Sequence, residues 1–187
     1  IKLTDFDGRT VLYTLAGNNI ELLKILLELL PEKDRLKAVM IKDSYDQFIR
    51  VRDFSMILEL LPAQDRLESL NIKDKFGGTK LYYAARYPIV LKTLLELLPE
   101  KDRLEAVKIN NFSEQAILHH AIGKPGVLKI IIDLLPEQDR LNAVMMRDSV
   151  GRTLLYRAAF DPESFKILIA LLPEQDRLEA VKIKDNS

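Results

Sequence analysis

A phrase of eleven residues recurs five times along this chain of 187 residues. Its last copy is LLPEQDRLEAV at 171–181, and the earlier copies begin at residues 29, 60, 97 and 134. From one copy to the next the spacing is 31 residues once and then 37 residues three times. A period of this size is typical of a solenoid, in which each unit buries its apolar side against its neighbours. The repeat therefore predicts one elongated domain over 1–187, with units at about 5–41, 43–72, 74–109, 111–146 and 148–183.

The first part of a unit predicts a turn followed by a helix. In DSVGRTLLYRAA, residues 148–159, Gly151 suits a turn that only glycine adopts cheaply. Thr153 follows at the position where a hydroxyl caps the first free N–H groups of a helix. Small residues end the segment, so we expect this helix to pack closely against another.

Two more helices are expected in each unit. The second segment, such as IELLKILLELL at 20–30, has apolar residues at helical spacing, and prolines open three of its copies (Pro88, Pro125 and Pro162). The repeated phrase forms the third segment, because its proline ends the second helix and can begin another. The fold class is therefore all-α.

Composition excludes several classes of protein. Lys and Arg number 28, as do Asp and Glu, so the chain lacks the general basic excess of nucleic-acid-binding proteins, although a local basic patch remains possible. Cysteine is absent, which rules out disulfides and thiolate metal sites and fits a reducing compartment such as the cytoplasm. No run of 18 apolar residues occurs, so no membrane span is expected.

The first segment resembles the ankyrin repeat, whose consensus is D-x-x-G-x-T-P-L-H-x-A-A. The matching residues are Asp5, Gly8, Thr10 and Leu12 in the first unit, Asp74, Gly77, Thr79, Leu81, Ala84 and Ala85 in the third, Leu118, His119 and Ala121 in the fourth, and Asp148, Gly151, Thr153, Leu155, Ala158 and Ala159 in the fifth. The resemblance implies an ankyrin-like solenoid of about five repeats, each with two antiparallel helices plus the short third helix. It also implies loops that project to one side and a concave binding surface.

The units depart from that consensus in a regular way. Tyrosine replaces the histidine in three units (Tyr13, Tyr82 and Tyr156), and the period exceeds 33 residues by about one helical turn. These 37-residue repeats are similar to the variant ankyrin arrays of secreted effectors of intracellular bacterial pathogens. That narrower resemblance implies an effector acting in the host cell cytosol.

The second unit is shorter than the others where its first helix should lie. It contains neither the Gly-x-Thr turn nor an alanine pair. We expect a shortened first helix within an unbroken stack. The alternative is a notch that offers Tyr45, Phe48, Arg50 and Arg52 to a partner.

The sequence offers little for catalysis, and we expect no enzyme activity, no cofactor and no metal site. The two histidines, His119 and His120, are adjacent on one helix and therefore point about 100° apart instead of converging on one ion. Phosphate-binding loops and hydrolase or metalloprotease motifs are absent from the sequence. The Asp-Arg pair of each repeated phrase is expected to pair internally or to cap backbone groups between units.

Positions that differ between units are the candidates for binding. We expect a protein partner to contact Lys80, Tyr83, Arg86, Tyr87, His120, Arg152, Arg157 and Phe160. The resulting interpretation is a non-catalytic protein-interaction module, in which replacing Tyr83 and Arg157 weakens binding without changing stability. The alternatives are a targeting segment of a larger enzyme, since the chain resembles a piece of a longer protein, and a structural spacer. The sequence leaves self-association open.

Overall fold

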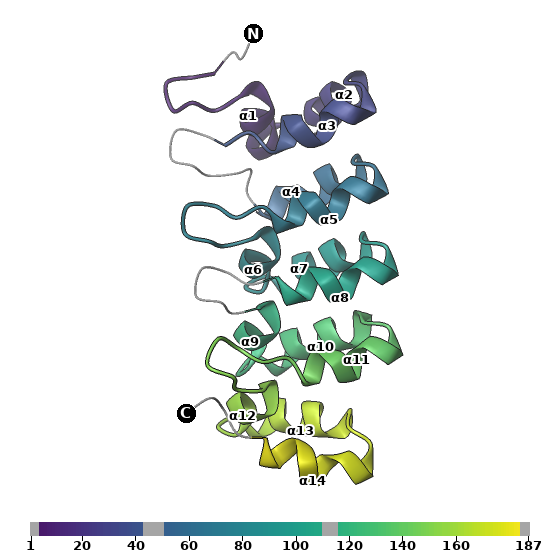
Figure 1. Cartoon of the computed structure of the whole chain (residues 1–187). Coiled ribbons are helices and arrows are strands. Elements are labelled where there is room, and N and C mark those ends of the chain that lie inside the picture. Colours follow the sequence, from purple (N-terminus) through teal and green to yellow (C-terminus); the bar gives the residue numbers. More distant parts are fainter. Residues whose placement is uncertain (1–3, 43–50, 110–115, 184–187) are drawn as a thin grey trace.

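The computed structural model describes residues 4–42, 51–109 and 116–183, which form a stack of short helices (Figure 1). The first helices of the repeats are α1 (Val11–Asn18), α6 (Lys80–Ala84), α9 (Ile117–Ala121) and α12 (Leu154–Ala158). The second helices are α2 (Ile20–Leu29), α4 (Val51–Glu59), α7 (Pro88–Glu96), α10 (Pro125–Leu134) and α13 (Pro162–Ala170). The third helices are α3 (Glu32–Val39), α5 (Ala63–Asn71), α8 (Glu100–Lys108), α11 (Glu137–Val144) and α14 (Glu174–Lys182). The all-α prediction, with a third helix in each repeat, is confirmed.

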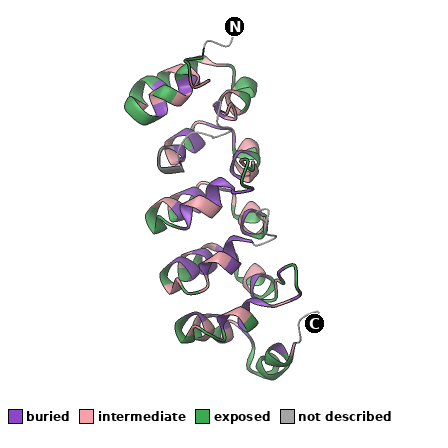
Figure 2. Ribbon diagram, turned by 90° about the vertical axis from the view of Figure 1, so that its left-hand side faces the viewer, coloured by how far each residue is buried: buried purple, intermediate pink, exposed green. Residues whose placement is uncertain are grey.

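Equivalent helices stack on one another from repeat to repeat. The second helices touch in succession from α2 to α13, and the third helices do so from α3 to α11. Buried residues follow this stack from end to end (Figure 2), and Leu23, Leu91 and Leu128 at equivalent places are fully buried. The core is therefore a continuous column shared between repeats instead of a set of separate cores.

The two ends of the stack show how much burial each repeat obtains from its neighbours. Val181 of α14 is 52% exposed, whereas the equivalent Val107 and Val144 are completely buried. At the other end Val11 is 54% exposed, whereas the equivalent Leu154 is completely buried. The same side chain position is thus core or surface depending only on whether a neighbouring repeat covers it.

The loops before the first helices explain the Asp-x-x-Gly-x-Thr pattern. In the fifth repeat, Oδ1 of Asp148 accepts hydrogen bonds from the N–H groups of Val150 and Arg152, at 3.1 and 3.0 Å. Gly151 has a φ of 82°, and Thr153 caps α12 by accepting from the N–H of Tyr156 at 3.2 Å. The first and third repeats make equivalent bonds around Asp5 and Asp74. These loops project from one side of the stack (Figure 1).

The predicted helix starts are also found. Pro88, Pro125 and Pro162 are the first residues of α7, α10 and α13. Asp161 caps α13 by accepting a hydrogen bond from the N–H of Ser164 at 2.9 Å. Each third helix directly follows the proline of the repeated phrase, which stands at its N-cap.

In three repeats the arginine of the repeated phrase joins one repeat to the next. Nε of Arg66 donates to the carbonyl of Leu61 at 3.1 Å, and its two Nη atoms donate to the carbonyls of Glu59 and of Leu97 in the following repeat, at 3.2 and 2.8 Å. These carbonyls lie at the C-terminal ends of second helices, where they lack helical partners. Arg35 and Arg103 reach the following repeat in the same way, through Leu60 and Leu134. Capping between units, one of the two predicted roles, is therefore confirmed.

The second repeat keeps its place in the stack. Its helices α4 and α5 lie between the matching helices of the first and third repeats, and Phe54 of α4 is buried. Tyr45, Phe48 and Arg50 of the predicted notch, and the side chain of Arg52, lie outside the described residues. No helix of the described ranges is long and apolar enough to cross a membrane.

Replacing Arg66 by Met should destabilise the protein by about 2–4 kcal/mol, because carbonyls in two repeats lose a charged donor while the apolar stem is kept. The matched variant is Arg177→Met, since Arg177 bonds Leu172 of its own repeat in the last unit of the described chain. That change should cost less than about 1.5 kcal/mol. Denaturant unfolding followed by circular dichroism measures both, and equal losses would contradict a role between repeats.

Candidate protein-binding face

The first helices of the third to fifth repeats present one continuous face. The fourth residue after the capping position lies on each short first helix, and the seventh and eighth lie in the turn that leads to the second helix. The large side chains at these positions, which we name the first-helix face, are Tyr83, Arg86 and Tyr87 of the third repeat, His120 and Lys124 of the fourth, and Arg157 and Phe160 of the fifth. The remaining positions are Gly123 and Asp161, the cap of α13. Helices α6, α9 and α12 contact one another in order, so the face crosses three repeats.

Phe160, Arg86 and Tyr87 are the most accessible residues of this face. Phe160 is 89% exposed and Tyr87 is 36% exposed. All three residues lie in the turn between a first helix and the following second helix, and Arg86 is also exposed. Aromatic and arginine side chains at such positions are the types that dominate binding energy in protein interfaces.

Two residues of the face bind the loop aspartates. The Tyr83 hydroxyl donates to Oδ2 of Asp74 at 2.6 Å, and burial together with this hydrogen bond raises the pKa of Tyr83 to about 12. In the fifth repeat the same carboxylate oxygen of Asp148 receives Arg152 at 3.0 Å and Arg157 at 3.3 Å. Burial raises the pKa of Asp148, but the hydrogen bonds from Arg152 and Val150 outweigh it and leave the pKa below its usual value. Tyr83, Arg152 and Arg157 therefore stabilise the loops, so replacing them is expected to lower stability, contrary to the sequence-based expectation.

The residues that surround the loop aspartate differ between repeats in matched pairs. A Cβ atom on Gly78 would lie 2.4 Å from the Tyr83 hydroxyl, so the tyrosine requires glycine there. The fifth repeat instead has Arg152 at the glycine position and Arg157 at the tyrosine position, and both arginines bind Asp148. Variation between units thus reflects two ways of satisfying one loop carboxylate.

A cluster of rings and cations occupies the middle of the face. The ring of Tyr82 lies 4.6 Å from that of His120, and Nζ of Lys124 lies 2.9 Å from Nε2 of His120. Burial, then Lys124 and Arg86, lower the pKa of His120, while burial and then Arg86 lower the pKa of Lys124. Since Lys124 donates this hydrogen bond, Nε2 of His120 is the unprotonated acceptor.

His119 points away from this cluster into the interior. It is only 2% exposed, and neither ring nitrogen has a hydrogen-bond partner within the described chain. Burial, and then the nearby charge of Arg157, lower its pKa to about 4. A neutral, buried ring is consistent with the structural role that the ankyrin resemblance implies. The described residues contain no group of three or more His, Cys, Asp or Glu suited to a metal ion.

Lys80 is not part of the accessible surface. It is 7% exposed at the position that Ile117 and Leu154 fill in later repeats, and its Nζ lies 5.0 Å from the ring centre of Phe54 in the second repeat. Burial lowers its pKa to about 7. This position varies because it faces the preceding repeat, so the expectation that Lys80 contacts a partner does not fit its burial.

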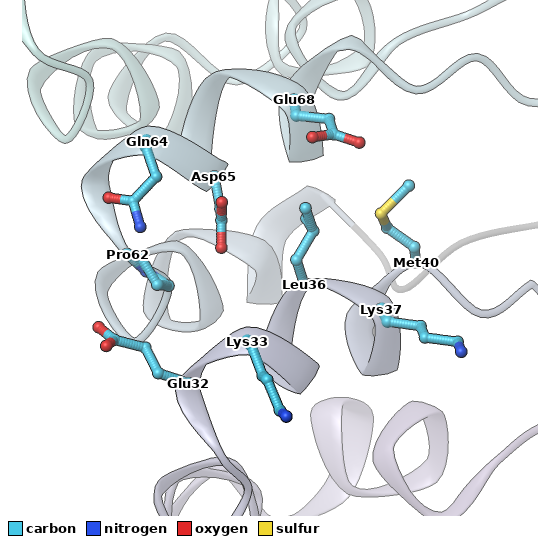
Figure 3. A pocket seen from close by; sticks show the side chains of 9 residues that line it. All are labelled: Glu32, Lys33, Leu36, Lys37, Met40, Pro62, Gln64, Asp65 and Glu68. Atoms are coloured by element: carbon cyan, nitrogen blue, oxygen red, sulfur yellow. The ribbon is translucent and has the colours of Figure 1, made fainter.

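A separate hollow of about 550 Å³ lies between the third helices α3 and α5 (Figure 3). Leu36 and Met40 supply apolar side chains, and Lys33, Asp65 and Glu68 contribute charges of both signs. Most of the lining residues belong to two copies of the repeated phrase. Other residues of the phrase pack between repeats. Its lining contains no aromatic side chain, unlike the first-helix face.

The loops, the helices and their stacking define an ankyrin-like solenoid. The chain is similar to the crystal structure of EF0377, an ankyrin repeat protein, with a TM-score of 0.60 and 20% sequence identity, in a match that covers 91% of this chain and 84% of that one. At this identity the likeness concerns the fold. No family model matches the sequence, and no curated protein matches it. Ankyrin folds generally mediate protein–protein interaction and are typically non-catalytic.

Two members of the central cluster were missed by the sequence-based interpretation. Tyr82 occupies the position of the consensus histidine, and Lys124 belongs to a Gly-Lys-Pro-Gly turn. The position of Lys124 within the repeat could have identified it as part of the first-helix face. It is the last residue before proline, equivalent to Tyr87 and Asp161, so it begins the second helix beside the first-helix face.

Giving the third repeat the two arginines that bind the loop aspartate of the fifth repeat should reveal strong energetic coupling between positions 78 and 83. Gly78→Arg alone should cost about 1–3 kcal/mol, because the new side chain meets Tyr83. Adding Tyr83→Arg supplies Asp74 with the two arginines that Asp148 has, and should recover at least about 1 kcal/mol in a double-mutant cycle. Unfolding free energies of the two single variants and the double variant test this, and additive effects would show that the positions are independent.

Acidification should destabilise the protein through His119. Its pKa is about 4 when folded against 6.5 when unfolded, so only the unfolded state takes up a proton between these values. Stability is therefore lost as the pH falls from about 6.5 to 4, by about 2–3 kcal/mol from this group. His119→Leu should remove most of that loss in urea titrations at pH 7 and 4.5. The matched change His120→Gln should remove less, and an unaltered pH dependence in His119→Leu would contradict the assignment.

Proposed function

We propose that this chain is a non-catalytic module that binds a protein partner through the first-helix face. Support comes from the ankyrin-like fold, which generally serves protein–protein interaction. A stacked array presents its surface preformed, so little conformational entropy is lost on binding. Six of the eight residues expected from the sequence belong to this face, and Arg152 lies beside it on the fifth loop.

The observation that carries this proposal is the exposure of Phe160. An aromatic side chain that is 89% exposed contributes little to the stability of the array. It stands beside Asp161, the cap of α13, at a turn that its neighbours already fix. An accessible aromatic residue on a backbone turn that is fixed by hydrogen bonds has the properties of an interface anchor.

The compartment of the partner depends on whether the chain acts as a secreted bacterial effector, as the narrower resemblance implies. If the chain acts as a secreted bacterial effector, its partner is a protein of the host cytosol. If it acts in the cell that makes it, the partner is cytoplasmic. The absence of cysteine fits either reducing compartment.

Phe160→Ala tests the proposed face. Proteins captured from host-type cytosol by the wild-type chain are identified, and the affinity of each purified candidate is measured by calorimetry. Phe160→Ala should weaken a true partner at least about tenfold, the size of a hot-spot loss, while leaving the melting temperature unchanged.

Ile89→Ala is the matched control, since Ile89 is 82% exposed on the second helix α7. It should leave the affinity within about twofold of wild type, which is within ordinary surface effects. A partner that binds Phe160→Ala as tightly as wild type would show that the interface lies elsewhere.

A further inference from the structure

Positive charge is concentrated on the loops of the third and fifth repeats and on the first helices of the last three repeats. Residues 72–87, 116–124 and 146–161 contain three acidic residues, which are Asp74, Asp148 and Asp161. They contain eight basic residues, which are Lys73, Lys75, Lys80, Arg86, Lys124, Arg147, Arg152 and Arg157. Since the whole chain is neutral, the remaining residues carry the compensating acidic excess.

The three acidic groups of this region are used within the fold. Asp74 receives the Tyr83 hydroxyl and two loop N–H groups. The Asp148 side chain is only 2% exposed and is bound by two arginines, and Asp161 caps α13. Asp74 and Asp148 therefore have partners within their own loops, whereas Asp161 stays partly exposed at its capping position.

Arg86 and Lys124 are two cations of the first-helix face for which the described ranges show no acidic partner. Nζ of Lys124 lies 2.9 Å from Nε2 of His120, and burial, followed by the like charge of Arg86, lowers the pKa of Lys124. Two cations held near each other beside aromatic rings repel one another and are poorly neutralised. An incoming carboxylate would relieve that repulsion, whereas another cation would increase it.

We propose that the first-helix face binds an acidic, extended segment of its protein partner. Carboxylates of that segment pair with Arg86 and Lys124, and an apolar side chain of the segment packs on Phe160. This inference rests on the proposed function and adds the chemistry of the partner to it. Stacked helices lie about 10 Å apart, so three first helices span about 20 Å, or about six extended residues.

Charge distribution favours a protein segment over a nucleic acid. Binding to nucleic acid normally uses many phosphate contacts and a general basic excess, which the neutral chain lacks. The acidic residues in the first turns of α3, α8, α11 and α14 would repel a long polyanion. A short acidic segment can satisfy the cluster without crossing those helices.

The test uses a fluorescent peptide of about 12 residues, twice the span of the face, that alternates Glu or Asp with Leu and Phe. Its counterpart replaces every carboxylate by the amide. The acidic peptide should bind the complete chain at least tenfold more tightly than the amide peptide, and added salt should weaken its binding. Equal affinities for the two peptides would overturn the inference.

Arg86→Gln combined with Lys124→Gln locates the site. This double variant should lose at least tenfold in affinity for the acidic peptide. The matched pair, Lys92→Gln with Lys129→Gln, removes the same charge from the exposed second helices α7 and α10 and should lose less than twofold. An equal loss in both pairs would indicate general electrostatic attraction and would overturn the inference.

The two histidines provide an independent readout by NMR. A carboxylate at Lys124 should shift the ring signals of His120, while those of the buried His119 should stay in place. Shifts at neither ring would place the peptide elsewhere and contradict the proposal. Tighter binding of a single-stranded oligonucleotide than of the acidic peptide would also overturn it.

Phe160→Ala separates this inference from the proposed function. If that variant weakens both peptides equally and the charge variants have no effect, the face binds protein but does not select acidic segments. If it changes neither the peptides nor the captured partners, the proposed face itself is wrong.

Discussion

The array depends on the hydrogen bonds that one arginine per repeat makes to the ends of the second helices. A short helix leaves its last carbonyls without partners, and five such helices end at the same side of the stack. Arg66 satisfies carbonyls of its own repeat and of the next with one planar guanidinium. The presence of this arginine in every copy of the repeated phrase fits this role, because in three copies it binds carbonyls of two repeats at once.

This linkage leaves the opposite side of each repeat free to differ. The loop aspartate needs its second oxygen satisfied, and the repeats achieve this with Tyr83 in one case and with Arg152 and Arg157 in another. Both solutions place large side chains at the edge of the first helices without changing the stack. The array can therefore alter its surface chemistry one repeat at a time while the spacing of the helices stays fixed.

Much of the fold could be predicted because periodicity reports directly on packing. The proline starts of the second helices, the loop glycines and the capping threonines each depend on local backbone chemistry, and each is found as expected. The site was less predictable, because variation between units does not reveal which way a side chain points. Lys80 varies since it faces a neighbouring repeat, and Tyr83 varies together with Gly78 across the loop. Both relations join residues in space in a way that one sequence cannot show.

A neutral chain with separated charges has a consequence for recognition. Net charge governs general attraction at long range, and here it is zero, so an acidic partner is not drawn to the molecule as a whole. Near the surface, the acidic first turns of the third helices repel such a partner, while Arg86 and Lys124 attract it. The difference in local charge between the third helices and the first-helix face would then determine where the partner binds. This difference depends less on the total charge. Separated charge of this kind contributes to orientation and selectivity more than to affinity.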